Sequence, residues 1–276
     1  MRTRLVTVVV AGLTAAAALA ACSSGGSAPS GTLTGTSAPT PATSPAGPGT
    51  TTAPVNGATG TTTSAPAATT GPTAARVPLV PLWPFTTTAQ AAAWQQAYRS
   101  GGHQPWHLDV GQTALSFVRG HLGYTDIDRV TSQAVNGADA RVGVGWTDAE
   151  TGRRTVGVLH LIRLGTGQDA PWVVVGSDDT TLTLDAPVYG ATVSSPLRIG
   201  GVISGVDEAL HVVVLGPASS VPLATVAGLP AGGERTPWST TLRFTAPSGT
   251  VLTVAVSTGG HVKGVERFAV TAVRVR

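Results

Sequence analysis

The sequence contains one cysteine, Cys22, and one methionine. A single thiol cannot form a disulfide within the chain, so the folded part must be held together by its hydrophobic core. Lys263 is the sole lysine, and no cluster of basic residues is dense enough to follow a nucleic-acid backbone or to recognise lipid headgroups. The composition therefore excludes a disulfide scaffold and indicates no nucleic-acid partner.

The amino terminus has the features of a secretory signal. Arg2 and Arg4 precede an apolar run at 5–18, which is too short for an ordinary membrane span, and small residues follow. Residues 19–22 read LAAC and resemble the lipobox of bacterial lipoproteins. The resemblance implies cleavage after residue 21 and a diacylglycerol on the thiol of Cys22. The alternatives are an alanine-rich signal with a chance cysteine and an uncut transmembrane anchor.

The net charge says little about partners. The chain has 17 basic and 14 acidic side chains, and loss of Arg2 and Arg4 with the signal would leave it almost neutral. Alanine, glycine, valine and arginine are frequent, which is typical of a G+C-rich genome and, with the lipobox, favours an actinobacterium. We therefore expect a lipid-anchored protein on the extracytoplasmic face of the cell membrane.

Residues 22–75 are predicted to be a disordered linker that begins at the lipidated cysteine. They are almost entirely Ser, Thr, Pro, Gly and Ala and include no charged residue. Such a segment cannot bury enough apolar surface to offset the entropy lost on ordering. Its threonines and prolines also permit O-glycosylation. Two modules are expected after it, at 76–180 and 181–276.

The first module, residues 76–180, is predicted to be a small α+β domain. Helices are expected at 86–102 and at 109–123, the second with Asp109 as N-cap and Gly123 as its stop. Strand patterns follow at 126–135, 139–146, 154–164 and 171–177, with a hairpin signal at Asn136-Gly137. This order indicates an antiparallel sheet with both helices on one face. The module resembles uncharacterised actinobacterial lipoproteins only in general plan.

The second module, residues 181–276, is predicted to be all β. Short strand patterns separated by Gly, Pro or Ser-Gly turns occur at 196–204, 209–216, 238–246, 251–258 and 266–275. This spacing is typical of a β-sandwich.

The same region carries a motif. The pattern P-x-x-G-x-x-V-x-S-P followed by G-x-x-x-G-V runs through Pro187, Gly190, Val193, Ser195, Pro196, Gly201 and Gly205. A Trp-Ser pair at 238–239 and a last strand follow in order. The segment 182–276 thereby resembles the immunoglobulin-like domain named from bacterial spore-germination proteins. The resemblance implies an extracytoplasmic module with no associated catalytic residues, and it implies no role in germination.

The loop GGHQPWHLD, residues 101–109, holds the densest group of chemically capable side chains. Its candidate contacts for a ligand or partner are His103, Trp106, His107 and Asp109. Two histidines four residues apart on a helix would face one metal ion, but Gly102 and Pro105 disfavour a helix here. No third ligand lies at a diagnostic spacing. We interpret the loop as structural, with Asp109 as a cap, Trp106 packed beneath it and the histidines bonded to backbone carbonyls.

Other polar and aromatic groups have structural interpretations too. The acidic pairs Asp126/Asp128 and Asp178/Asp179 are predicted to cap turns, because neither belongs to a loop rich enough in oxygen ligands for calcium. The segment PLVPLWPF, residues 78–85, is expected to be extended and to cross the first domain, with Trp83 as the tryptophan least expected in the core.

The function predicted from the sequence is that of a lipid-anchored, non-enzymatic binding or assembly module of the bacterial cell envelope. Its expected partners are the membrane, through Cys22, and an envelope protein or glycan. No catalytic residue, metal or cofactor is expected. Two alternatives stay open. One is a cell-wall-active, metal-dependent hydrolase that uses His103 and His107, and the other is a small-ligand-binding lipoprotein, which requires a deep pocket.

Overall fold

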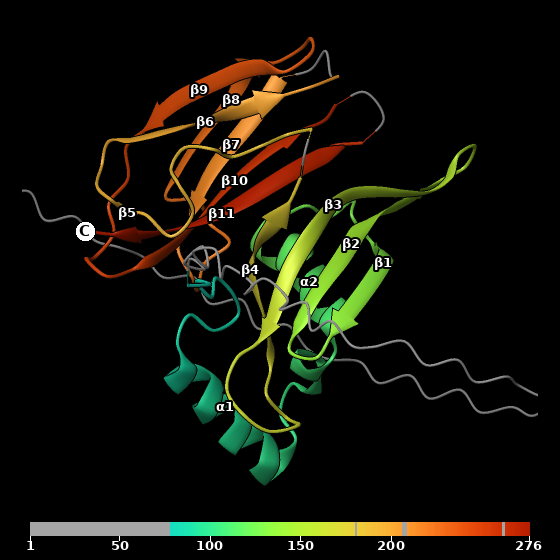
Figure 1. The fold of residues 1–276 in the computed structure, drawn as a ribbon, viewed down its shortest axis with the longest axis vertical. Coiled ribbons are helices and arrows are strands. Elements are labelled where there is room, and N and C mark those ends of the chain that lie inside the picture. Colours follow the sequence, from blue (N-terminus) through green and yellow to red (C-terminus); the bar gives the residue numbers. More distant parts are fainter. Residues whose placement is uncertain (1–77, 180, 206–208, 261–262) are drawn as a thin grey trace, which may run out of the picture. The chain divides into compact units, whose positions relative to one another are not determined.

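The computed structural model describes residues 78–179, 181–205, 209–260 and 263–276 (Figure 1). The predicted signal peptide, Cys22 and the linker lie outside the described residues. All described residues belong to one compact unit, Thr69–Arg276. Within them, no helix is both long and apolar enough to cross a membrane.

Helix α1, Thr88–Gly101, begins and ends at the predicted signals. The hydroxyl of Thr87 accepts a hydrogen bond from Gln90 N, and the Gln90 side chain accepts one from Thr87 N, each at 3.2 Å. These bonds form a capping box that satisfies two of the free N–H groups at the helix start. Gly102 ends the helix in the left-handed region, with φ 69°.

The second helix differs from its prediction in its last turns. After a short 3-10 helix η1, Pro105–Leu108, the helix α2 spans Val110–Ser116 and continues as the π-helix η2, Phe117–His121. The Leu122 amide bonds back to Phe117 O, five residues earlier. This wider turn was not predicted, because nothing in the residue spacing separates it from an α-helix.

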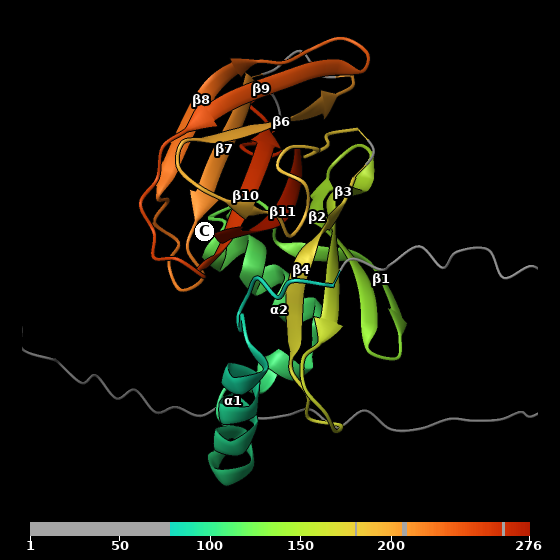
Figure 2. The same ribbon diagram turned by 60° about the vertical axis from the view of Figure 1, so that its left-hand side comes forward.

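The predicted four-stranded meander is present. Strands β1 (Arg129–Asn136), β2 (Asp139–Asp148), β3 (Gly152–Arg163) and β4 (Trp172–Asp178) pair antiparallel in chain order. Helix α2 covers one face, where Ala114 and Phe117 share a core cluster with Val174 (Figures 1 and 2). The expectation that both helices cover this face was wrong. Helix α1 belongs to a separate cluster, in which its Ala91 packs with Val173 and Val175 of β4. These two residues stand on either side of Val174 in the strand, so their side chains point to the opposite face of the sheet.

The C-terminal part consists of two β-sheets around a second core. One sheet has the order β5-β11-β10-β7-β8, and the other pairs β6 with β9. The strands are β5 (Thr192–Val193), β6 (Leu197–Ile203), β7 (Ala209–Leu215), β8 (Ala224–Pro230), β9 (Thr236–Leu242), β10 (Val251–Thr258) and β11 (Arg267–Val275). Apolar side chains such as Ile199, Val214, Trp238 and Val254 fill the space between the sheets.

The three inner strands of the larger sheet, β7, β10 and β11, are largely buried on both faces. Val212 and Val214 point into the core between the two sheets, whereas Val213 and Leu215 join the cluster of α2 and the meander. The side chains that the C-terminal part contributes to that cluster are Val213, Leu215, Val251, Ala255, Val265, Phe268, Val270 and Ala272. All eight residues of β10 are buried. The two parts thus share one hydrophobic cluster, and their separation near residue 181 stays a prediction.

The proline-rich segment at residues 78–85 is extended, as predicted, and runs along the edge of β4. Leu82 N donates to Val174 O, and Val174 N donates to Trp83 O, both at 2.8 Å. Leu82 is buried, and the half-buried Trp83 packs against the shared cluster. We call residues 78–85 the strap.

Candidate functional site

The structure separates the side chains of the loop at 101–109. Asp109 caps α2, since its Oδ1 accepts a bond of 2.8 Å from Gln112 N. His103 is exposed, Trp106 is half-buried, and only 2% of His107 is exposed. The predicted cap is therefore confirmed, and the two histidines do not face one position.

His107 lies inside a box of aromatic rings. Its ring centroid is 5.1 Å from those of Phe85 and Trp94 and 3.6 Å from that of Trp106. Its Nε2 lies 3.2 Å from Oε1 of Gln104, so the expected bond to a backbone carbonyl is replaced by a side-chain bond. Burial lowers the pKa of His107 to about 4, because the enclosed ring cannot solvate a charge. At neutral pH this histidine is an uncharged part of the core.

The ring contacts continue from the loop toward the C-terminal part. Trp106 stacks on Trp83 with centroids 5.6 Å apart, and Trp83 also lies 6.2 Å from the ring of His121. His121 Nε2 is 3.4 Å from Thr253 Oγ1 on β10. Burial lowers the pKa of His121 to about 4 as well. In the described residues no three or more His, Cys, Asp or Glu side chains are placed to share a metal ion.

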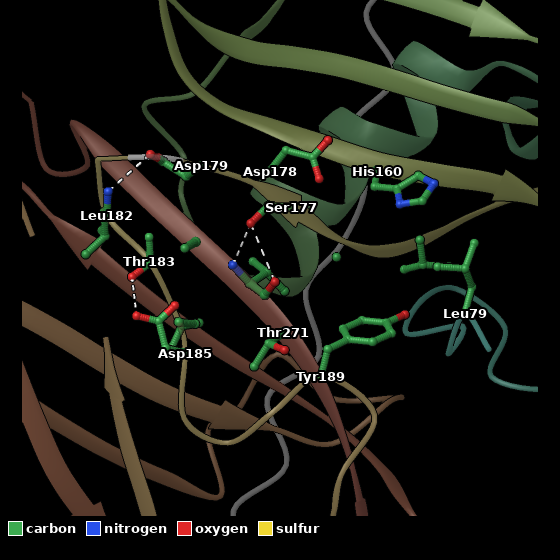
Figure 3. A pocket seen from close by; sticks show the side chains of 15 residues that line it. Leu79, His160, Ser177, Asp178, Asp179, Leu182, Thr183, Asp185, Tyr189 and Thr271 are labelled. Atoms are coloured by element: carbon green, nitrogen blue, oxygen red, sulfur yellow. Dashed lines mark hydrogen bonds between the residues drawn. The ribbon is translucent and has the colours of Figure 1, made fainter. Parts of the chain in front are cut away.

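A different group of residues forms a hollow between the meander and the C-terminal part (Figure 3). The hollow has a volume of about 330 Å³ and is bordered by the ends of β3 and β4, the strap, β11 and the segment 182–189. Its apolar lining includes Leu79, Leu184 and Tyr189. Its polar lining comprises His160, Ser177, Asp178, Asp179, Thr183, Asp185 and Thr271.

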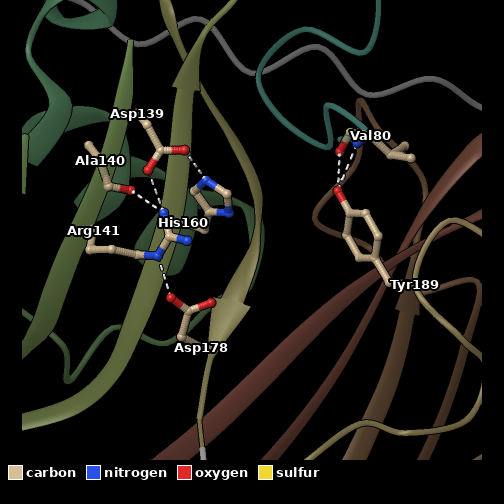
Figure 4. A network of polar contacts seen from close by, with 7 residues as sticks. All are labelled: Val80, Asp139, Ala140, Arg141, His160, Asp178 and Tyr189. Atoms are coloured by element: carbon tan, nitrogen blue, oxygen red, sulfur yellow. Dashed lines mark hydrogen bonds and ion pairs between the residues drawn. The ribbon is translucent and has the colours of Figure 1, made fainter. Parts of the chain in front are cut away.

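A charged network on the sheet borders this hollow (Figure 4). His160 Nε2 lies 2.6 Å from Oδ2 of Asp139, and Arg141 pairs with both Asp139 and Asp178. Burial raises the pKa of Asp139, but its bonds to His160 and Arg141 outweigh that effect and leave the pKa below its usual value. The network therefore holds the carboxylate of Asp139 ionised at neutral pH. The prediction that Asp178 caps a turn was wrong, because its carboxylate binds Arg141.

Ser177 ties β4 to β11. Its Oγ accepts a bond of 2.7 Å from Val270 N and lies 3.5 Å from Val270 O. The hydroxyl is thus used by the backbone of the neighbouring strand, while His160 is bonded through Nε2 to Asp139. Ser177 and His160 both line the hollow, but these bonds do not join them as nucleophile and base.

Tyr189 holds the strap at the mouth of the hollow. Its hydroxyl accepts a bond of 2.7 Å from Val80 N and lies 3.4 Å from Val80 O (Figure 4). Burial raises the pKa of Tyr189, so the phenol remains protonated at neutral pH. The bond ties the strap to Tyr189, so Leu79 and the Tyr189 ring line the hollow together.

Sequence reasoning did not find this site. Its residues come from positions as distant as Leu79, His160 and Thr271, so no spacing along the chain reveals them. The sequence pattern predicts only that the adjacent pair Asp178/Asp179 caps turns. Asp179 does cap a turn, since its Oδ1 accepts bonds from Thr181 N and Leu182 N. Comparisons with protein families, with characterised proteins and with solved structures find no match to this chain.

Proposed function

We propose that this protein is a lipid-anchored, non-enzymatic binding module of the bacterial cell envelope and that the hollow between its two parts is the binding site. The hollow carries the proposal, because it combines apolar walls with a few convergent polar groups at a junction of two structural parts. Small-ligand and side-chain sites prefer such junctions. The lipid on Cys22 and the linker at 22–75 hold this site outside the membrane.

The bonds around the hollow favour binding over catalysis. A hydrolase needs a nucleophile or a metal-bound water next to a base. Here the hydroxyl of Ser177 is bonded to Val270, and His160 is bonded to Asp139. The histidine pair of the loop, His103 and His107, has one exposed ring and one enclosed ring. These groups position the walls of the site and take no part in a reaction.

The C-terminal part is an immunoglobulin-like domain in this proposal. The family motif is supported by local geometry, since Gly190 and Gly205 both have φ 75°, a conformation that favours glycine. At Gly201 glycine is required for lack of space, because a Cβ at this position would lie 1.9 Å from Thr183 O. Ser195 Oγ accepts a bond from Phe244 N and so fixes the Ser-Pro turn to the following strands.

Photocrosslinking in cells tests the proposed function. A photoreactive residue replaces Leu79, which is 42% exposed at the hollow, in the full-length lipoprotein, and a matched variant carries it at Val221, which is 71% exposed and lies outside the hollow. We expect discrete adducts from position 79 and none from position 221. Equal labelling from both positions, or wall hydrolysis by the intact protein that His107→Gln abolishes, would contradict the proposal.

A further inference from the structure

We infer that the hollow between the meander and the C-terminal part, which we call the junction hollow, recognises an alkylammonium group. This group is either the side chain of a lysine-like residue or a free diamine. The inference rests on the proposed function and adds the chemical class of the ligand. Three observations carry it: two carboxylates without a cation partner, a hydroxyl of a largely buried threonine that has no partner in the described residues, and an aromatic wall.

The charge around the hollow is negative. Four carboxylates lie in it or at its border, those of Asp139, Asp178, Asp179 and Asp185. The guanidinium of Arg141 pairs with the first two only. Within the described residues, Asp179 and Asp185 form no ion pair, so the site attracts a cation and repels an anion.

Three other basic side chains lie near the hollow, and none of them forms an ion pair with Asp179 or Asp185 in the described residues. Arg267 lines a neighbouring hollow that Asp178 and Asp179 also line, and it donates to Ser204 O at 2.6 Å. Arg274 is near enough to affect Tyr189 but does not line the site. His160 faces the hollow and is bonded to Asp139. None of these groups is bonded to Asp179 or Asp185 within the described part of the chain.

The two unpaired carboxylates are held in place and keep acceptor capacity. Asp179 Oδ1 accepts bonds from Thr181 N at 2.6 Å and from Leu182 N at 3.1 Å. Asp185 Oδ2 accepts a bond of 2.8 Å from Thr183 Oγ1. The second oxygen of each carboxylate receives no hydrogen bond from a described residue. An ammonium group has three donors and fits such preset acceptors.

Thr271 is the independent observation. It lines the hollow, only 4% of it is exposed, and its hydroxyl has no hydrogen-bond partner among the residues that the structure describes (Figure 3). The hydroxyl is not among the fully enclosed polar atoms, so it is reachable from the hollow. A polar group of a ligand in the hollow can therefore bond to it, in addition to the carboxylates.

The apolar wall matches the aliphatic part of the same ligand. Tyr189 is fixed by Val80, and its ring lies in the hollow together with Leu79 (Figure 3). An aromatic ring in the same hollow as carboxylates favours an ammonium through its negative face, and the methylene stem gains by leaving water. The hollow therefore suits a short chain of methylenes that ends in an amine.

Calorimetric titration of the intact, detergent-solubilised lipoprotein tests this inference. The probes are 1,5-diaminopentane, Nα-acetyl-lysine methylamide and the uncharged Nα-acetyl-norleucine methylamide. We expect at least one amine to bind and the norleucine compound not to bind. Asp185→Asn should weaken amine binding about tenfold through loss of a charge-assisted bond, and Thr271→Val should weaken it less. Glu150→Gln, which removes the same charge on an exposed turn, should not change it.

The outcomes distinguish the amine inference from the proposed binding function. Binding of the diamine alone identifies a free polyamine as the ligand, and binding of the lysine compound alone identifies a peptide side chain. Equal binding of the norleucine compound, or equal weakening by Asp185→Asn and Glu150→Gln, overturns the amine inference. No binding of any probe together with adducts from position 79 overturns the inference but leaves the proposed function. No binding and no such adducts overturn both.

Discussion

Phe268 of β11 lies directly against Gly157 of β3. A Cβ built on Gly157 would be 2.5 Å from Cε1 of the Phe268 ring, and the ring itself is fully buried. The close approach joins the meander to the C-terminal sheet at a point where no side chain can be added without displacement. The same ring is 5.5 Å from that of Tyr124, so it cannot easily move aside.

Gly157→Ala should therefore destabilise the protein by about 2 kcal/mol, which is typical of overpacking in a rigid core. Gly120→Ala is the matched control, because an added Cβ at Gly120 has no atom within 4 Å and the residue is exposed. Thermal or urea unfolding of the two variants measures the difference. Equal stability of both would show that the two parts do not pack as closely as the structure indicates.

The buried histidines predict a loss of stability in mild acid. The pKa of His107 and of His121 is lowered from 6.5 to about 4 in the folded state, so the unfolded chain binds more protons between these values. Stability is therefore fully present above pH 6.5 and falls as the pH drops to about 4, by a total on the order of 3 kcal/mol for each histidine. Urea unfolding at a series of pH values measures this slope.

The double variant His107→Phe, His121→Phe is the control for that pH dependence. It keeps aromatic rings in the core but removes both titrating groups, so its stability should change much less between pH 6.5 and pH 4.5. Carboxylates with lowered pKa values, such as those of Asp169 and Asp139, are protonated only at lower pH, so their contribution to the stability of the protein is lost below this range. An unchanged slope in the double variant would assign the acid sensitivity to other groups.

The loop at 101–109 predicts a graded response to substitution. Asp109→Ala removes the cap of α2 and should cost about 1 kcal/mol. Trp106→Ala removes a half-buried indole that stacks on Trp83 and should cost more, about 2 kcal/mol. His103→Gln should change stability by less than about 0.5 kcal/mol, because the side chain is exposed. A metal site would reverse this order, and a chelator would then lower the melting temperature of the wild type alone.

Separation of the two parts has a measurable cost. A fragment that begins at Asp179 contains the predicted sandwich but exposes Val213, Val251, Phe268 and Val270 to water. We expect this fragment to melt at a lower temperature than the full chain and to bind a hydrophobic dye or self-associate. A fragment that is monomeric and as stable as the whole chain would show that the shared cluster contributes nothing to the second module.

The proposed lipid anchor is tested at Cys22 itself. Cys22→Ala should leave the protein unlipidated, and therefore either released from the membrane or retained as a precursor. Intact-mass measurement of membrane-extracted wild type and variant distinguishes these states. An unmodified thiol on Cys22 in the mature wild-type protein would end the interpretation as a lipoprotein.

The local elements could be predicted because their signals are local. The turn at Asn136-Gly137 pairs Asn136 with Asp139, as the dipeptide indicates, and the caps at Thr87 and Asp109 form where expected. Strand β8 was missed because its sequence, ATVAGLP, has the glycine and proline of a loop. Gly228 adopts φ 75° in that strand, within an irregular stretch of its pairing with β7.

The arrangement of the two parts could not be predicted in the same way. Strand β10 reads VLTVAVST, an apolar run without alternation, which is typical of a strand buried on both faces. The apolar run predicts that both faces of β10 are covered, but it does not indicate which helix or sheet packs on the second face. The junction hollow depends on this packing and on Ser177 and Val270, which meet across 93 positions of the chain. No local rule reaches such a distance.

The strap has a mechanical consequence if the chain is anchored through Cys22, as we propose. The chain enters the described structure at Pro78, and the first bonds that it meets are those of Val80 with Tyr189 and of Leu82 and Trp83 with Val174. Tension along an anchored chain would therefore reach the two structural parts together, through Tyr189 in one and β4 in the other. Since Leu79 lies at the same place, stretching would act first on the wall of the hollow, before it reached either core.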